Sequence, residues 1–126
     1  MIPKIRAWSK KFKRMYEVTL IDYENGDVGL KDDHGGVAIG DIKQLILMQS
    51  TGLKDKNGVE IFEGDVVKLK YTITSDFELF EVRQFKGGMW RIDNRRRGSD
   101  LWLRNEGCEV IGNIYQNSEL LESVDE

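Results

Sequence analysis

Arginines interleaved with tryptophans have the most specific chemistry in this chain. They are Trp90, Arg91, Arg95, Arg96, Arg97, Trp102 and Arg104. Guanidinium groups bind phosphates and indole rings stack on bases, so this pattern in a small β-protein is typical of a site for single-stranded nucleic acid. A solvated loop between core aromatics gives the same pattern. The net charge of −3 favours that second interpretation, because polyanion binding needs clustered positive charge.

A second basic cluster lies near the N-terminus, at Lys10, Lys11, Lys13 and Arg14. It would enlarge the arginine-rich surface only if both clusters shared one face of the molecule. The sequence predicts neither their distance nor their orientation, so nucleic-acid binding stays the alternative hypothesis.

Asp55, Asn57 and Gly58 have the spacing that begins a calcium-binding loop. Such a loop ends in a bidentate glutamate at its twelfth position, and counting from Asp55 places Val66 there. The segment therefore predicts a structural turn, since Asp and Asn side chains bond nearby backbone groups and glycine allows positive φ.

Glu63 and Asp65 flank Gly64 and place two carboxylates close together in sequence. Paired carboxylates can perform acid–base catalysis. No nearby residue types supply a nucleophile and its base together, so this run predicts a solvated bend.

Cys108 is the single cysteine and His34 the single histidine. One cysteine forms no internal disulfide, which excludes a secreted disulfide scaffold, and a structural zinc site needs four ligands. We expect a buried, inert Cys108 and an exposed His34. We predict no catalytic residues, no metal site and no cofactor.

Glycine usage indicates a mainly β protein. The chain has 13 glycines, one proline, 40% hydrophobic and 10% aromatic residues, which favours short strands separated by turns around a real core. Alternating patterns predict strands at 2–8, 15–23, 28–31, 37–39, 45–49, 59–62, 66–71, 79–85, 89–92 and 109–115.

Glycine-containing turns separate these strands. Asn25-Gly26 predicts a type I′ hairpin, Lys86-Gly87-Gly88 another turn, and Gly112 a bulge. Helix is expected only as single turns, at 40–43 and after an Asn117 cap.

Large aromatic side chains are expected to fill the core. They are Trp8, Tyr16, Phe62, Tyr71, Phe80, Phe85, Trp90, Trp102 and Tyr115. Small β proteins often cover exposed strand edges by pairing with a second copy, so a homo-oligomer is expected.

The N-terminal residues carry basic side chains without the apolar stretch of a signal peptide. No run approaches the ~18 apolar residues of a membrane span. These patterns predict a cytoplasmic protein with no membrane partner.

Residues 47–67 resemble the central signature of the YopX-like family, which phages and prophages encode, mainly in Gram-positive bacteria. Two flanking blocks match as well, Arg6-Ala7-Trp8 with Met15-Tyr16, and residues 109–121. The resemblance spans nearly the whole chain in three ordered pieces. Departures lie between Thr72 and Arg104.

The resemblance implies a mainly β fold, with an N-terminal β-rich segment packed on a small C-terminal SH3-like barrel. We expect subdomains at residues 1–50 and 51–126. The signature residues are expected to be structural turns; they are Thr51, Gly52, Leu53, Asp55, Asn57, Gly58, Glu63, Gly64 and Asp65.

The function expected from this resemblance is that of a non-catalytic phage or prophage accessory protein. It would self-associate or bind a phage or host protein. The alternative is a nucleic-acid-binding accessory protein that uses the arginine-rich loop.

Overall fold

The computed structural model describes residues 4–125, except for the side chains of residues 121, 123 and 125. The chain forms two compact units, Met1–Gln49 and Ser50–Glu126. Strand β5 contributes to both, because its first half pairs with β1 and its second half with β6.

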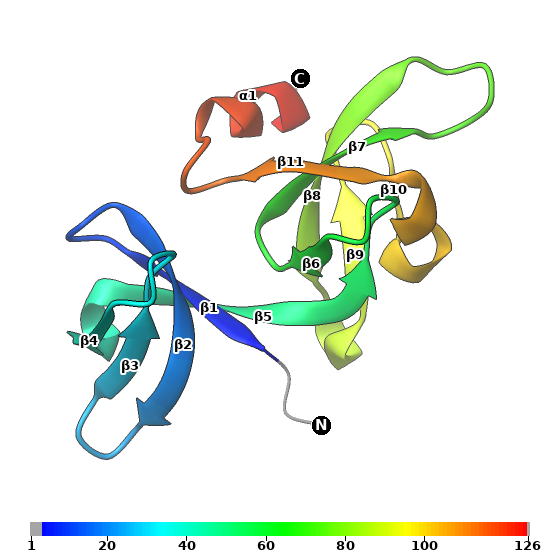
Figure 1. Cartoon of the computed structure of the whole chain (residues 1–126). Helices are drawn as coiled ribbons and strands as arrows, with labels where there is room; N and C mark the ends of the chain where they lie inside the picture. The colour runs from blue at the N-terminus through cyan, green and yellow to red at the C-terminus, as the bar shows by residue number, and fades with distance from the viewer. Residues whose placement is uncertain (1–3, 126) are drawn as a thin grey trace. The chain divides into compact units, whose positions relative to one another are not determined.

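The first unit is an antiparallel sheet with the strand order β4-β3-β2-β1-β5 (Figure 1). Its elements are β1 (Ile5–Ser9), β2 (Arg14–Asp22), β3 (Asp27–Lys31), β4 (Val37–Asp41), the 3₁₀ turn η1 (Ile42–Gln44) and β5 (Leu45–Lys54). Side chains alternate between the two faces of a strand, and Ala7, Val28, Leu30 and Leu45 pack together as one small hydrophobic core.

The second unit holds an antiparallel sheet in the order β10-β9-β8-β7-β11, and β6 pairs with β5. Its strands are β6 (Glu60–Phe62), β7 (Asp65–Lys70), β8 (Phe77–Gln84), β9 (Trp90–Asp93), β10 (Gly98–Asp100) and β11 (Glu109–Asn113). The helices are short: η2 (Lys86–Gly88), η3 (Leu101–Leu103), η4 (Asn105–Gly107) and α1 (Glu119–Asp125), which lies against β8.

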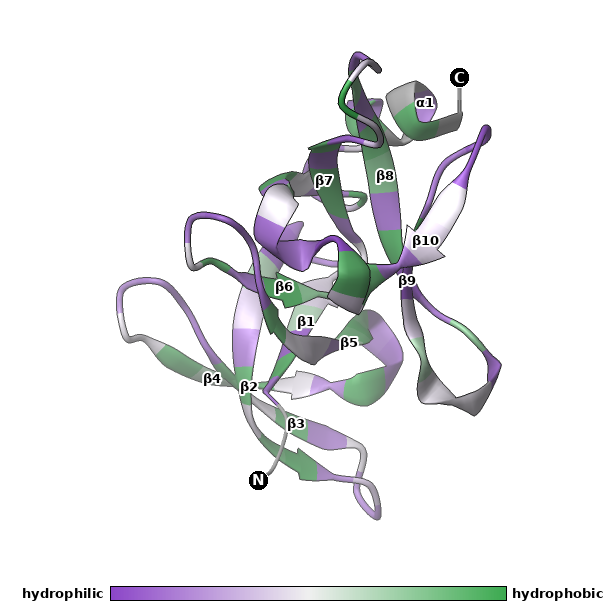
Figure 2. Cartoon of the chain, turned by 90° about the vertical axis from the view of Figure 1, so that its right-hand side faces the viewer, coloured by the Kyte–Doolittle hydropathy of each residue, from purple (hydrophilic) through white to green (hydrophobic). Residues whose placement is uncertain are grey.

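The core of the second unit follows from alternation along its strands. Figure 2 shows hydrophobic and hydrophilic residues alternating along β8, whose Phe80 and Val82 are fully buried. Ile61, Ile92 and Leu101 join them from β6, β9 and η3. Burying such side chains stabilises the unit by about 1.5–3 kcal/mol each.

The prediction of a mainly β protein with short helices is confirmed. The SH3-like barrel is not confirmed, because neither sheet closes on itself. In the described residues, no helix has the length and hydropathy needed to cross a membrane.

The prediction of a type I′ turn at Asn25-Gly26 is wrong. Gly26 has φ +74°, but Asn25 does not have positive φ. The Asp22 carboxylate accepts hydrogen bonds from the Glu24 and Asn25 N–H groups, which favours a longer turn closed by Gly26 N–H to Asp22 C=O at 2.8 Å.

Several predicted boundaries are also wrong. Strand β5 continues to Lys54 through Gly52, and β10 lies inside a predicted loop. Helix α1 begins at Glu119, two residues after Asn117, whose side-chain oxygen accepts from Asn113 N–H. The bulge at Gly112 is confirmed by the register shift between β11 and β7, and residues 2 and 3 of the predicted first strand lie outside the described part.

Candidate functional site

Asp55 lies in the signature segment, residues 47–67, and accepts three backbone hydrogen bonds. Its side chain is buried, and one carboxylate oxygen accepts from Asn57 N–H at 2.8 Å and Val59 N–H at 2.9 Å. The other oxygen accepts from Val110 N–H of β11 at 2.8 Å. One carboxylate therefore closes the turn between β5 and β6 and ties that turn to β11.

The protonation of Asp55 follows from these bonds. Burial alone would raise its pKa, but the N–H groups of Val110, Val59 and Asn57 together lower the pKa below the ordinary aspartate value. The charged form is thus the one that the fold holds at neutral pH. This arrangement supports a structural role for the Asp55 turn.

Thr51, Gly52 and Leu53 form a bulge at the end of β5. Gly52 has φ +76°, and the register between β5 and β6 shifts between Ser50 and Lys54. Thr51 Oγ1 donates to Ile61 C=O at 2.7 Å and accepts from Leu53 N–H at 3.2 Å. The bulge is therefore held by side chain-to-backbone hydrogen bonds.

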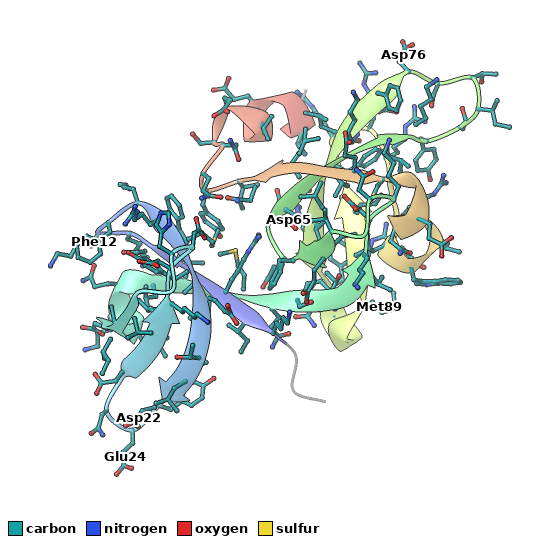
Figure 3. All side chains as sticks on the ribbon, in the orientation of Figure 1. Phe12, Asp22, Glu24, Asp65, Asp76 and Met89 are labelled. Atoms are coloured by element: carbon teal, nitrogen blue, oxygen red, sulfur yellow. The ribbon has the colours of Figure 1, made fainter. Side chains whose placement is uncertain are left out.

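Glu63, Gly64 and Asp65 form the turn into β7. Gly64 has φ +84° and Asp65 is buried inside the unit, where Figure 3 labels it. Asp65 Oδ2 accepts from Phe62 N–H at 2.8 Å, while Gly64 N–H donates to Val82 C=O. The predicted solvated bend is wrong for Asp65, because its carboxylate is enclosed and fastens the turn.

Arg91 of the arginine-rich segment is held by acidic residues of its own sheet. Its guanidinium lies 3.4 Å from Asp93 and 3.3 Å from Asp100. It also lies 5.2 Å from the ring centroid of Phe85, which is 46% exposed. A guanidinium with these partners presents less of its hydrogen-bonding edge to a phosphate.

Arg97 and Arg104 both lie against the ring of Tyr71. Their guanidinium carbons are 4.9 Å and 4.2 Å from its centroid. Arg97 also pairs with Glu78 at 3.4 Å, and Arg104 donates to Tyr71 C=O at 2.8 Å. In these cation–π contacts the Tyr71 ring binds two arginines of the same chain.

The remaining residues of the segment divide into two groups. Trp90 packs against the core, whereas Arg95, Arg96 and Trp102 are exposed, Trp102 by 67%. Phe85 and Trp102 were predicted as core residues, and both predictions are wrong. Phe85 follows the last residue of β8, and η3 turns Leu101 inward in place of Trp102.

Cys108 is fully buried, and burial raises the pKa of its thiol to about 11. A protonated thiol is a poor nucleophile, and its Sγ lies 3.4 Å from Asn105 C=O, to which it donates. His34 is exposed in the turn after β3, as predicted. Within the described residues, no three His, Cys, Asp or Glu side chains group as metal ligands.

A pocket of about 600 Å³ in the first unit was missed by sequence reasoning. It lies between the β1–β2 turn, the middle strands, and the β4–η1 segment. Its lining residues are Ser9, Lys11, Phe12, Tyr16, Leu30, Ala38, Ile39, Gly40, Asp41, Gln44 and Leu45. This volume falls in the range of protein ligand pockets, and the lining is mostly apolar.

The wall that carries Phe12 is an ordered turn. Ser9 is buried, its hydroxyl accepts from Phe12 N–H at 3.0 Å, and its C=O accepts from Lys13 N–H at 2.9 Å. Lys10 N–H donates to Gln44 C=O at 3.0 Å. The Phe12 side chain, labelled in Figure 3, is 63% exposed. An apolar residue between lysines was the sequence feature that could have indicated this pocket.

Comparison with known proteins gives a consistent result over most of the chain. The model of the YopX protein family matches residues 4–122. The SPbeta prophage-derived uncharacterized protein YopX of Bacillus subtilis strain 168 is 26% identical over 132 residues, which cover 94% of this chain and 96% of that protein.

Two crystal structures resemble the chain over nearly their full length. Protein EF1440 from Enterococcus faecalis is 34% identical, with a TM-score of 0.64 over 96% of this chain and 99% of that one. Protein YopX from Bacillus subtilis is 26% identical, with a TM-score of 0.64 over 97% and 98% of the two chains.

Asp55→Asn is expected to lower the free energy of unfolding by roughly 2–4 kcal/mol, because an amide replaces a charged acceptor and its NH₂ group meets backbone N–H donors. The stabilisation by Asp55 is present above the unfolded pKa and is lost as pH falls through the lowered folded pKa. Urea unfolding from pH 7 to pH 2.5 measures both effects. Asp76→Asn, at the exposed residue directly before β8 that Figure 3 labels, is the control. Equal stabilities for the two variants would contradict the assignment.

Gly98→Ala tests the packing around the Arg91 ion pairs. A Cβ at position 98 would lie 1.9 Å from Asp93 Oδ1 and 2.8 Å from Arg91 Nη2. We expect a loss of about 1–3 kcal/mol in thermal or urea unfolding, as in other overpacked sites. Gly107→Ala is the matched control, because its Cβ would meet Leu69 at an ordinary 3.7 Å. An unchanged stability for the position-98 variant would show that the ion pairs move aside without cost.

Proposed function

Since this chain belongs to the YopX protein family and one relative is named as prophage-derived, we propose that it is a phage or prophage accessory protein that acts by binding, without catalysis. We place it in the cytoplasm of a bacterial host. The partner is a phage or host protein, or a second copy of the chain.

The pocket of the first unit is the observation that carries this proposal. Its apolar walls, Tyr16, Leu30 and Leu45, surround a space large enough for a bulky side chain. Phe12 stands at its rim, where it adds apolar area that a partner can cover. An anchor side chain in such a pocket supplies much of the binding energy of a protein interface.

The charges near the pocket favour a partner with acidic residues next to its apolar anchor. Lys11 lines the pocket, and Lys10, Lys13 and Lys43 belong to the neighbouring turn and η1. Their positive charges increase the association rate with an acidic partner and make it sensitive to salt.

Catalysis has little support from the second unit. The Asp55 and Asp65 carboxylates accept hydrogen bonds from backbone N–H groups, and the raised pKa of the Cys108 thiol keeps it protonated at neutral pH. The arginine-rich segment supports the nucleic-acid alternative less than its sequence suggests, because Arg91 and Arg97 face acids of the same unit.

Affinity capture from host cells with an induced prophage tests the proposal. The full-length chain is immobilised, and the lysate is treated with nuclease so that retention through nucleic acid is removed. We expect one protein to be retained by the unmodified chain and its affinity to fall at least about tenfold with Phe12→Ala, because a partly exposed anchor is truncated.

Ile73→Ala is the matched control, since Ile73 is 98% exposed in the turn after β7. It should retain the same protein with unchanged affinity. The proposal fails if nothing is retained beyond bare beads, or if both variants retain the protein equally. Retention that nuclease abolishes would support the nucleic-acid alternative instead.

A further inference from the structure

Two Asn-Gly pairs lie in turns of this chain, Asn25-Gly26 between β2 and β3 and Asn57-Gly58 between β5 and β6. Asparagine is chemically labile, and a following glycine increases its lability because no Cβ hinders attack by the glycine nitrogen on the asparagine side chain. The reacting residue types are the same in both pairs. A difference in their reactivity therefore reports how firmly the fold holds each pair.

The reaction of such a pair is deamidation. The glycine backbone nitrogen gives up its proton and bonds to the asparagine Cγ, while the Cγ–Nδ2 bond breaks and the amide nitrogen leaves as ammonia with that proton. Water then opens the resulting succinimide ring. Opening at Cγ gives aspartate, whereas opening at the main-chain carbonyl gives isoaspartate, in which the backbone runs through the side chain. Both products carry an additional carboxylate, and water is the only co-reactant.

Hydrogen bonds hold the reacting groups of Asn25-Gly26. Asn25 Nδ2 donates to Asp22 Oδ2 at 2.8 Å, and Gly26 N–H donates to Asp22 C=O at 2.8 Å. The Gly26 C=O in turn accepts from Ile42 N–H at 2.9 Å. The Gly26 nitrogen can reach Cγ of Asn25 only after local opening of this turn, which costs free energy.

The fold holds Asn57-Gly58 less firmly. Both residues are exposed, and Asn57 Nδ2 donates to Glu109 Oε2 at 3.3 Å, a longer bond than the one at Asn25. Gly58 N–H donates to Asp55 C=O at 3.0 Å. A Cβ at position 58 would meet no atom within 4 Å, so the glycine has open space around it. A smaller local opening therefore suffices for the reaction.

We propose that Asn57 is a modification site, which deamidates in the folded chain ahead of Asn25 and whose product loosens the turn that Asp55 closes. The new carboxylate replaces an amide that lies 3.3 Å from Glu109, so two negative charges then repel each other. Isoaspartate also lengthens the backbone between residues 57 and 59. This displaces the Val59 N–H from Asp55 Oδ1, to which it donates at 2.9 Å. The inference is independent of the proposed binding function.

Peptide mapping by mass spectrometry tests the order of the two sites in the full chain, aged in warm, mildly alkaline buffer. We expect the products at residue 57 to form about threefold faster than those at residue 25, because opening at Asn57 costs less free energy. In urea the two rates should converge, since the hydrogen bonds are lost. Equal rates in the folded chain, or a rate ratio that urea leaves unchanged, would overturn the proposal.

Asp22→Ala tests why Asn25 is protected. It removes the carboxylate that accepts from Asn25 Nδ2, so the rate at residue 25 should rise about threefold while the rate at residue 57 stays the same. Circular dichroism checks that the variant is folded. An unchanged rate at residue 25 would show that this bond does not set the order of the two sites.

The aged chain itself tests the structural consequence. Anion exchange separates the fraction modified at residue 57, because it carries an additional negative charge. This fraction should unfold at a lower urea concentration than the unmodified chain, and its Val110 amide, which donates to Asp55, should exchange faster. Equal urea midpoints and equal exchange would overturn the proposed loosening. The proposed binding function is tested separately, through capture with Phe12 of the first unit.

Discussion

A single buried carboxylate, that of Asp55, holds together segments of the second unit that are distant in sequence. Two of its three backbone donors belong to its own turn, and the third, Val110, belongs to the last strand. The neighbouring Lys56 N–H donates to Cys108 C=O, so the turn lies against the segment that leads into β11. Removing the acceptor would leave buried N–H groups unpaired, which costs more than a lost surface contact. The signature segment is therefore a structural clamp, and its acidic residues are used by the fold.

Much of the fold could be predicted from local patterns. The turns at Asp22, Asp32 and Asp55 each combine an aspartate with a following glycine, and in each the carboxylate accepts nearby N–H groups. Strand β10 was not predictable by periodicity, because its residues are small or polar. Ser99 is buried there, and the Asp100 carboxylate forms an ion pair with Arg91. The long-range bond from Val110 to Asp55 had no local signal at all.

The candidate functional sites were likewise only partly predictable from the sequence. Acidic residues close to Arg91 in sequence could have indicated internal ion pairs, whereas Tyr71 between Arg97 and Arg104 could not have been foreseen. The pocket is lined by segments far apart in the chain, two of which the Lys10–Gln44 backbone hydrogen bond joins. The pocket that we propose as a binding surface thus arises from tertiary contacts, which residue types alone do not reveal.

Amide hydrogen exchange and pH titration by NMR test the role of Asp55 most directly. The Asn57, Val59 and Val110 amides should exchange slowly at neutral pH and should shift together at one apparent pKa, below the ordinary aspartate range. The amide of the exposed Ile73 is the reference for fast exchange. A Val110 amide that exchanges as fast as Ile73, or that does not titrate with the other two, would contradict the account.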